Sequence, residues 1–388
     1  MSTIKSYTEV FMSATITQYL TNNTLVGDFL RQVSESVWRA DFWLPSGLTW
    51  QDLQSTDNLQ FPEFSDVWIY PLLFSLVFLF FQYNFLEPLV LAPLAKAVGI
   101  SNFRPPPPPP NSSMAIIFHR YGRKVPEAVL VEASRESKLS VRQAERWIRA
   151  CYKATRVNKH DLFLSAGVNV ISHTIFFIGG WLIMYFKPWV WNITLCWQNY
   201  PYHNVDADVW WYYMTVLTFF WASTISDIGQ PRRISEGKLK IIVHHVLTVI
   251  LMTFSWVCNF TRIGTLVLLV HECADIPLLL AKMCIYAKKQ TASNIFFVVF
   301  LVLWLATRCV MYPFWVMRSV FFEATTYMFM PSAYIFFFLL TAVLVLNLMW
   351  TLLIFRTLIR LLQKKGPLKE EKSSTESEDE VEETKKEE

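Results

Sequence analysis

Seven long apolar stretches alternate with polar segments along the chain, and they constrain its fold more than any other feature. The hydrocarbon core of a bilayer is about 30 Å thick, and an α-helix of about 20 apolar residues crosses it. Lipid offers no partners to backbone N–H and C=O groups, so such a segment folds as a helix. The expected spans are roughly residues 67–95, 162–186, 209–228, 241–258, 264–281, 295–317 and 333–356. We therefore predict an all-α polytopic membrane protein with about seven transmembrane helices.

The composition excludes a soluble globular fold. Apolar residues make up 53% of the chain and charged residues 17%, and most charges lie outside the apolar stretches. A soluble helix needs a polar face, which the long stretches lack. Residues 1–28 show no apolar core of a cleavable signal peptide. The six cysteines are scattered without a CxxC pair, so we expect neither a disulfide framework nor a zinc site.

The charge of the loops predicts the orientation, because cytosolic loops are enriched in Lys and Arg. Residues 96–160 carry 13 of these cations, and residues 229–240 and 282–294 carry four and three. One cation stands in each alternate loop, at residues 187–208, 259–263 and 318–332. We therefore predict a lumenal N-terminus and a cytosolic C-terminus in the membrane of the endoplasmic reticulum.

Short motifs outside the spans agree with this orientation. Asn22 begins an Asn-x-Thr glycosylation signal in the predicted lumenal segment. Ser373 and Ser377 each have a Glu three residues later, which is the pattern of acidophilic kinases. Lys385 and Lys386 occupy the fourth and third positions from the end, as in dilysine retrieval signals of the endoplasmic reticulum.

The polar segments divide the chain into parts. We expect a lumenal segment at 1–66, a first span at 67–95, a cytosolic part at 96–160, six further spans at 161–362 and a disordered acidic tail at 363–388. Within the cytosolic part, Pro105–Pro110 favour a stiff polyproline II linker. Residues 139–147 resemble the start of a homeodomain recognition helix, but the following residues lack the Asn that would bind adenine. We expect this basic helix to contact anionic lipid and no nucleic acid.

Ionisable side chains gather in the hairpin formed by the fourth and fifth spans. Each costs about 2.5–3.5 kcal/mol inside a membrane, so such groups usually have a function. The first helix of the hairpin carries His244, His245 and Thr248, and the second carries His271, Glu272 and Asp275. At a rise of 1.5 Å per residue, the two sets differ in depth by only about 5 Å. We predict a shared pocket that opens toward the cytosol.

Three kinds of role fit this cluster. A neutral imidazole beside a carboxylate is a base near neutral pH, and histidine can also carry an acyl group, so both routes suit acyl transfer. Membrane di-iron enzymes use many more histidines, so we expect no metal. Polar contacts between helices, without chemistry, are the third role. We assign no function to His173, which stands alone in the second span.

The hairpin resembles the Lag1 motif of ceramide synthases, which lies within the TLC domain. The resemblance rests on His244-His245-x-x-Thr248, Ser255, Asn259, Arg262, Gly264-Thr265, His271, Asp275 and Ala281-Lys282. Trp43-Leu44-Pro45, Leu48-Thr49-Trp50 and Tyr312-Pro313 also resemble that family, so the likeness covers about residues 40–360. It implies that the last six spans form a TLC-type helical bundle around a lipid cavity.

The resemblance also implies an N-acyltransferase. Such an enzyme joins a fatty acyl group from acyl-CoA, its co-substrate, to the amine of sphinganine or sphingosine, with no other cofactor. It implies membrane lipids as partners and homo- or heterodimers with paralogues. By matching positions, His244 and His245 are the catalytic pair and Asp275 their carboxylate partner, with His271 and Glu272 beside them. The implied substrate-binding residues are Thr248, Asn259, Arg262 and, for the CoA phosphates, Arg232 and Arg233. Loop 318–332 corresponds to the place where the family sets acyl-chain length.

Three departures from the family pattern leave an alternative open. Glu272 stands where the family has Asp, and Leu279 stands where it usually has Glu. The loop at residues 230–233 lacks the usual Arg-Lys-Asp-Phe run. A non-enzymatic TLC-domain lipid sensor or carrier, or a regulatory subunit of an active ceramide synthase, is the alternative to an active enzyme.

Overall fold

The computed structural model describes residues 32–34, 36–56, 59–155, 158–229 and 236–363. Each of the seven predicted spans is helical. The long helical segments are α5 (Asp66–Phe81) with η2 (Gln82–Leu91) and α6 (Ala92–Ala97), α10 (Lys159–Met184), α12 (Ala207–Gly229), α13 (Glu236–Val257), α14 (Thr261–Tyr286), α15 (Gln290–Trp304) with η4 (Leu305–Met317), and α17 (Ala333–Leu362). The all-α fold class predicted from the apolar stretches is confirmed. The direction in which the chain crosses the membrane stays a prediction.

Six of these segments are long and apolar enough to cross a bilayer, and α12 is the exception. This helix begins with a run of Trp and Tyr and carries Asp227 near its end. It packs against α5 on one side and α13 on the other, and about half of its residues are buried. A helix that faces protein on several sides does not need an apolar surface toward lipid, which explains its more polar sequence.

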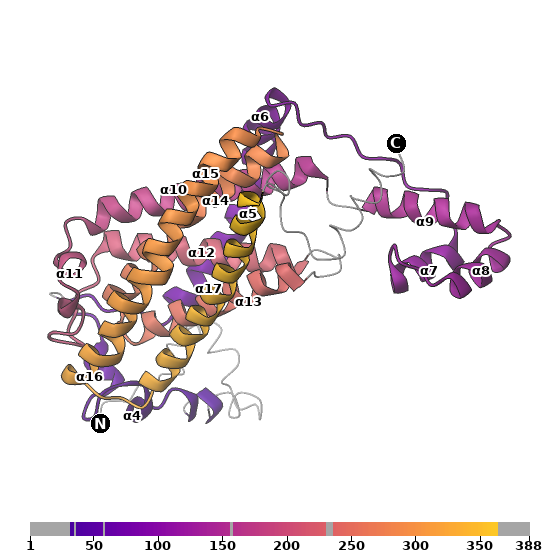
Figure 1. The fold of residues 1–388 in the computed structure, drawn as a ribbon. Coiled ribbons are helices and arrows are strands. Elements are labelled where there is room, and N and C mark those ends of the chain that lie inside the picture. The colour runs from indigo at the N-terminus through magenta and orange to yellow at the C-terminus, as the bar shows by residue number, and fades with distance from the viewer. Residues whose placement is uncertain (1–31, 35, 57–58, 156–157, 230–235, 364–388) are drawn as a thin grey trace.

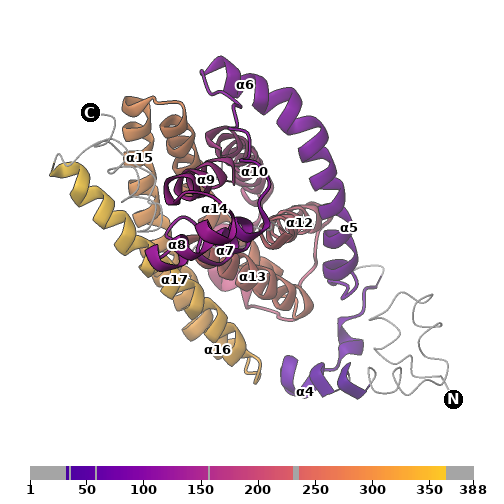
Figure 2. The ribbon, with the colours of Figure 1, turned by 90° about the vertical axis from the view of Figure 1, so that its right-hand side faces the viewer.

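The most buried helix of the bundle is α14, because neighbours cover it on several sides. It packs against α10, against α15 and η4, and against α13, to which it is joined by a tight turn. The last helix, α17, packs against α13 and η4 (Figure 1). Figure 2 shows α5 and α17 on opposite flanks of the bundle. The hairpin that carries the polar cluster is therefore central.

Prolines coincide with two π-helical segments in the long helices. The first is η2 with Pro88, inside the first predicted span. The second is η4 with Pro313. Proline lacks the N–H of a regular helical turn, and wider turns are a common way to accommodate it. In both places the chain remains helical, so the prolines widen the helix without ending it.

Residues 38–56 and 59–64 fold over one end of the bundle. Trp43 and Leu44 are buried there, and the N–H of Ser332 donates to the Phe42 carbonyl at 2.9 Å. From α13, the indole N–H of Trp256 donates to the Glu63 carbonyl at 2.9 Å. These contacts tie the segment before the first span to α13 and to the start of α17.

A small three-helix unit lies apart from the bundle, at the right of Figure 1. It consists of α7 (Ser112–Tyr121), α8 (Glu127–Glu136) and α9 (Val141–Thr155), packed around its own apolar cluster. The cluster contains Met114, Leu130, Ala133, Ala144 and Ile148. The proline run leads into this unit in an extended form, and the Trp147 indole donates to the Pro109 carbonyl at 2.8 Å.

Asn259 makes the turn between α13 and α14 possible. Its φ is +53°, a left-handed conformation that Asn tolerates better than most residues. The side chain is buried, and Nδ2 donates to the carbonyls of Pro201 and His203 at 2.8 and 3.0 Å. The turn is thereby bound to the loop that precedes α12.

We expect Asn259→Ala to lower the free energy of unfolding by about 2–4 kcal/mol. The change adds strain of about 1 kcal/mol at positive φ and removes both hydrogen bonds from Nδ2. The His203 carbonyl then has no donor, while the Pro201 carbonyl keeps the bond from the His203 N–H. Asn259→Gly relieves the strain but not the missing hydrogen bonds, so it should be the milder variant. Denaturant unfolding of the detergent-solubilised protein measures both. Equal stability of all three proteins would contradict this role.

Candidate active site

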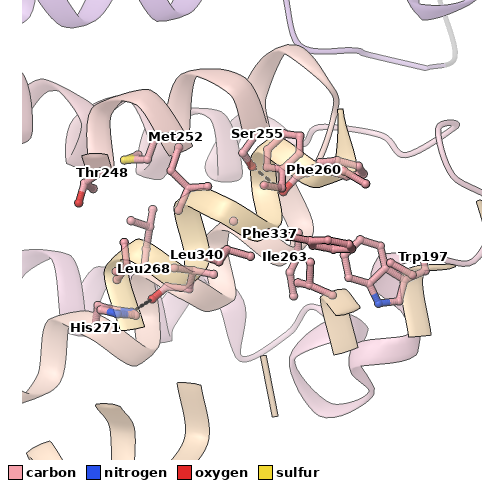
Figure 3. A pocket seen from close by; sticks show the side chains of 18 of the residues that line it. Trp197, Thr248, Met252, Ser255, Phe260, Ile263, Leu268, His271, Phe337 and Leu340 are labelled. Atoms are coloured by element: carbon pink, nitrogen blue, oxygen red, sulfur yellow. Dashed lines mark hydrogen bonds between the residues drawn. The ribbon is translucent and has the colours of Figure 1, made fainter. Parts of the chain in front are cut away.

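A cavity runs between α13, α14 and α17 inside the bundle, with an empty volume of about 1310 Å³ including its opening. Most of its walls are apolar, with Met252, Leu268 and Leu340 among them. Polar groups concentrate at one end, at His244, Thr248, His271 and Glu272. In Figure 3, Thr248 and His271 lie at one end of the cavity and Trp197 at the other. A long apolar space with a few convergent polar groups is typical of a site for an apolar ligand.

The far end of the cavity borders the outside of the protein. It is lined by residues between η5 (Ser319–Glu323), α16 (Ala324–Tyr327) and the start of α17. Phe329 and Tyr334 belong to this lining and are 63% and 66% exposed. Part of loop 318–332, which the family resemblance links to acyl-chain length, therefore lines the end opposite the histidines. The most exposed lining residues lie at this end, which the charge pattern predicts to be lumenal, so the predicted opening toward the cytosol stays a prediction.

The structure gives His244 and His245 different surroundings. His244 lines the cavity and packs edge-on against Trp350, with ring centroids 5.3 Å apart. His245 is turned toward α12, where its Nδ1 lies 3.7 Å from a carboxylate oxygen of Asp227. That distance is too long for a hydrogen bond. Both Nδ1 atoms are buried without a hydrogen-bond partner among the described residues. Each is therefore free to bond to a ligand or to move a proton.

His271 has one occupied and one unoccupied ring nitrogen. Its Nδ1 lies 2.7 Å from the Val267 carbonyl, which accepts hydrogen bonds only, so Nδ1 carries the proton. The buried Nε2 then holds a lone pair, and no described residue donates to it. The ring packs edge-on against Tyr312 at 4.7 Å between centroids. His271 is thus a second imidazole that lines the cavity, with an unpaired ring nitrogen.

Asp275 contacts an arginine that sequence reasoning missed. We predicted Asp275 as the carboxylate partner of the histidine pair, but its hydrogen bond in the structure comes from Arg308 Nη2, at 2.8 Å. The same Nη2 donates to the His271 carbonyl at 2.5 Å, and Nη1 lies 3.5 Å from the Asn347 amide oxygen. The Arg308 side chain is only 2% exposed. A catalytic role of Asp275 stays a prediction.

Glu272 has a partner from another helix. Its Oε2 lies 2.5 Å from Nδ1 of His173 on α10, and the two side chains are 3% and 13% exposed. Sequence reasoning placed Glu272 in the cluster but left His173 alone in its span. The two residues are 99 positions apart, and only the packing of α10 against α14 brings them together.

The other predicted binding residues are placed as follows. Thr248 lines the cavity, but its hydroxyl donates to the carbonyl of His244 at 2.9 Å, one turn earlier. Arg262 donates to the Leu195 carbonyl at 2.7 Å and stacks on Trp189, near the turn that Asn259 makes. The observed contacts of Asn259 and Arg262 are therefore with the loop before α12, and substrate binding by them stays a prediction.

Several predicted residues lie outside the described part of the chain, and their roles stay predictions. They are Arg232, Arg233, Asn22, Ser373, Ser377, Lys385 and Lys386. Within the described ranges, no group of three His, Cys, Asp or Glu side chains is arranged to hold a metal ion.

Comparison with known proteins gives consistent matches. A family model described as the TLC domain matches residues 162–356. Ceramide synthase 5 of Mus musculus is 29% identical over 347 residues, covering 88% of this chain and 82% of that protein. Ceramide synthase 4 of Homo sapiens is 29% identical over 355 residues, covering 91% and 89%. Ceramide synthase 3 of Mus musculus is 30% identical over 285 residues, covering 72% of each chain.

We expect Arg308→Met to lower the free energy of unfolding by about 3 kcal/mol or more, because it leaves Asp275 without its cationic partner inside the bundle. Adding Asp275→Asn should recover part of the loss, since a neutral amide is easier to bury. Arg318→Met is the matched control. Arg318 is 65% exposed and pairs with Glu323 at 3.2 Å, and such exposed pairs contribute below about 1 kcal/mol. Equal losses in denaturant unfolding of Arg308→Met and Arg318→Met would contradict this assignment.

Proposed function

This chain belongs to the TLC domain family, and from that membership and its relation to ceramide synthases we infer that it is a ceramide synthase. We propose that it transfers a fatty acyl group from acyl-CoA to the amine of a sphingoid base, giving ceramide or dihydroceramide. The observation that carries the proposal is the shape of the cavity. A long apolar space ends at the imidazoles of His244 and His271.

The cavity suits an acyl chain whose reactive end lies at the histidines. The apolar walls along α13, α14 and α17 remove hydrocarbon from water, at about 25 cal/mol for each Å² of apolar surface buried. The thioester carbon would then sit at the polar end, where the Nδ1 atoms of His244 and His245 have no partner among the described residues. The CoA part of the acyl-CoA molecule would remain outside this apolar space.

Two chemical routes fit this end of the cavity. In the first, a histidine takes a proton from the attacking amine, and the thiol of CoA leaves. In the second, His244 or His245 accepts the acyl group from CoA and passes it to the amine. General base catalysis of this kind typically contributes a factor of about 10²–10⁴ to the rate. His244 lines the cavity and His245 lies behind it, so we assign the contact with the acyl group to His244.

We further propose that the protein lies in the membrane of the endoplasmic reticulum with a lumenal N-terminus and a cytosolic C-terminus. The alternation of cation-rich and cation-poor loops supports this orientation. It places the histidine end of α13 on the cytosolic side, where acyl-CoA is supplied. Arg232 and Arg233 then stand in a cytosolic loop beside α13, as expected for residues that bind the CoA phosphates.

The test uses microsomes from cells that lack their own ceramide synthases. We expect wild-type protein to convert sphinganine and a panel of acyl-CoAs into amides detected by mass. His244→Ala should lower the rate about a hundredfold or more, through loss of the imidazole. His119→Ala is the control and should retain activity, because His119 is exposed on the separate three-helix unit. Absence of product from folded wild-type protein would favour a lipid carrier, a sensor or a regulatory subunit.

A further inference from the structure

The pair formed by His173 and Glu272 is a second polar site beside the catalytic histidines. The Nδ1–Oε2 distance of 2.5 Å and the low exposure of both side chains describe a short, buried hydrogen bond. A charged or polar group costs free energy inside a membrane, and such groups tend to line cavities and act there. Glu272 does line the cavity, at the same end as His244.

Only one oxygen of the Glu272 carboxylate has a hydrogen-bond partner among the described residues. His173 bonds to Oε2, and no other described residue forms a hydrogen bond to this side chain. A carboxylate has lone pairs on both oxygens, so Oε1 keeps its capacity to accept hydrogen bonds. In an otherwise apolar cavity, the group that best matches a buried carboxylate is a cation with N–H donors.

An aromatic layer joins this pair to the catalytic histidines. The ring of His173 packs edge-on against Phe219 at 5.3 Å, and Phe219 contacts Phe220 at 5.8 Å. Phe220 in turn packs against His245 at 5.6 Å and His244 at 6.4 Å. The pair and the histidines therefore flank the same end of the cavity from α10 and α14 on one side and α13 on the other.

The contact depends on the length of the Glu272 side chain. The family that this hairpin resembles has Asp at this position, and Asp is one methylene shorter. The extra methylene brings the carboxylate to His173, so the two residues work together in this chain.

We propose that Glu272 receives the amino group of the sphingoid base and that His173 is a positioning residue for its carboxylate. This inference rests on the proposed function, because it assigns the second substrate of the same reaction to a site. The carboxylate accepts hydrogen bonds from the ammonium group, and His173 fixes the rotamer from the opposite side.

With this assignment, both protons that leave the ammonium group during the transfer have an acceptor. The ammonium gives one proton to Glu272, and the free amine attacks the acyl carbon. The new N–C bond forms as the C–S bond of the thioester breaks, and the second proton moves from nitrogen to sulfur through His244. The products are the amide, CoA thiol and one proton, which Glu272 returns to water. If the acyl group is first carried on His244, the C–S bond breaks as the bond from the imidazole nitrogen to the acyl carbon forms, and the imidazole proton goes to the thiolate. The amine then breaks the bond to the imidazole nitrogen, which takes the second proton of the amine.

The test measures steady-state constants for each substrate separately. We expect His173→Phe to raise KM for sphinganine about tenfold or more and to leave KM for acyl-CoA within a factor of two, since a hydrogen bond to a charged group has about that worth. His173→Asn should stay close to wild type, because its side-chain N–H can replace Nδ1. Thr174→Val is the control on the same helix and should change neither constant, since its hydroxyl bonds only to the Val170 carbonyl.

A double-mutant cycle separates positioning from packing. Glu272→Asp withdraws the carboxylate from His173, so it should raise KM for sphinganine by a factor similar to that of His173→Phe. The double variant should add little, because the contact is already lost. Additive effects, or equal changes in both KM values, in proteins that elute as folded particles would overturn the inference.

Equilibrium binding of labelled sphinganine to the purified protein keeps this inference distinct from the proposed reaction. If wild-type protein binds sphinganine more tightly than His173→Phe but makes no amide, the amine site stands and the acyltransferase proposal fails. If the wild type makes amide and His173→Phe binds and uses sphinganine equally well, the acyltransferase stands and the amine site fails.

Discussion

Three polar side chains on α14, at positions 271, 272 and 275, shape the centre of the bundle. His271, Glu272 and Asp275 point in different directions from one helix, and each has its own partner in the interior. Glu272 bonds to His173 on α10, Asp275 bonds to Arg308 on η4, and His271 bonds to a carbonyl of its own helix. Unpaired charges cost several kcal/mol in such surroundings, so the helices that supply partners must lie next to α14. Of these, α10 makes the most extensive contact with α14, and η4 continues α15, which also packs on it.

These pairings leave histidine ring nitrogens without a hydrogen-bond partner at the polar end of the cavity. Arg308 holds the backbone of His271 as well as Asp275, so the position of one cavity-lining imidazole depends on an ion pair behind it. On the two histidines that line the cavity, Nε2 of His271 and Nδ1 of His244 have no partner among the described residues. Rigid support from behind and unoccupied nitrogens in front are what an acid–base site requires, because positioning must not depend on the substrate.

The sequence was sufficient for the helices and for the position of the polar cluster, and insufficient for its pairings. Apolar length determines where a helix lies in a membrane chain, so each predicted span was found. The hairpin followed from the short connection around Asn259. The pairing of His173 with Glu272 and of Arg308 with Asp275 depends on how neighbouring helices are rotated and ordered, which local patterns do not encode. An arginine within the sixth span was the one available signal for the second pair, since a buried cation needs a counter-charge.

Residue 272 shows why a departure from a family pattern must be interpreted together with the contacts of the side chain. Considered alone, Glu in place of Asp adds a methylene, and a shift near 1 Å in a packed site can cost about a hundredfold in rate. In the structure the added length does not push the carboxylate into empty space or against a wall. It reaches a histidine on α10 that holds it at the edge of the cavity. The longer side chain and His173 therefore compensate each other, and the departure is better explained as a different way to fix a carboxylate than as damage to the site.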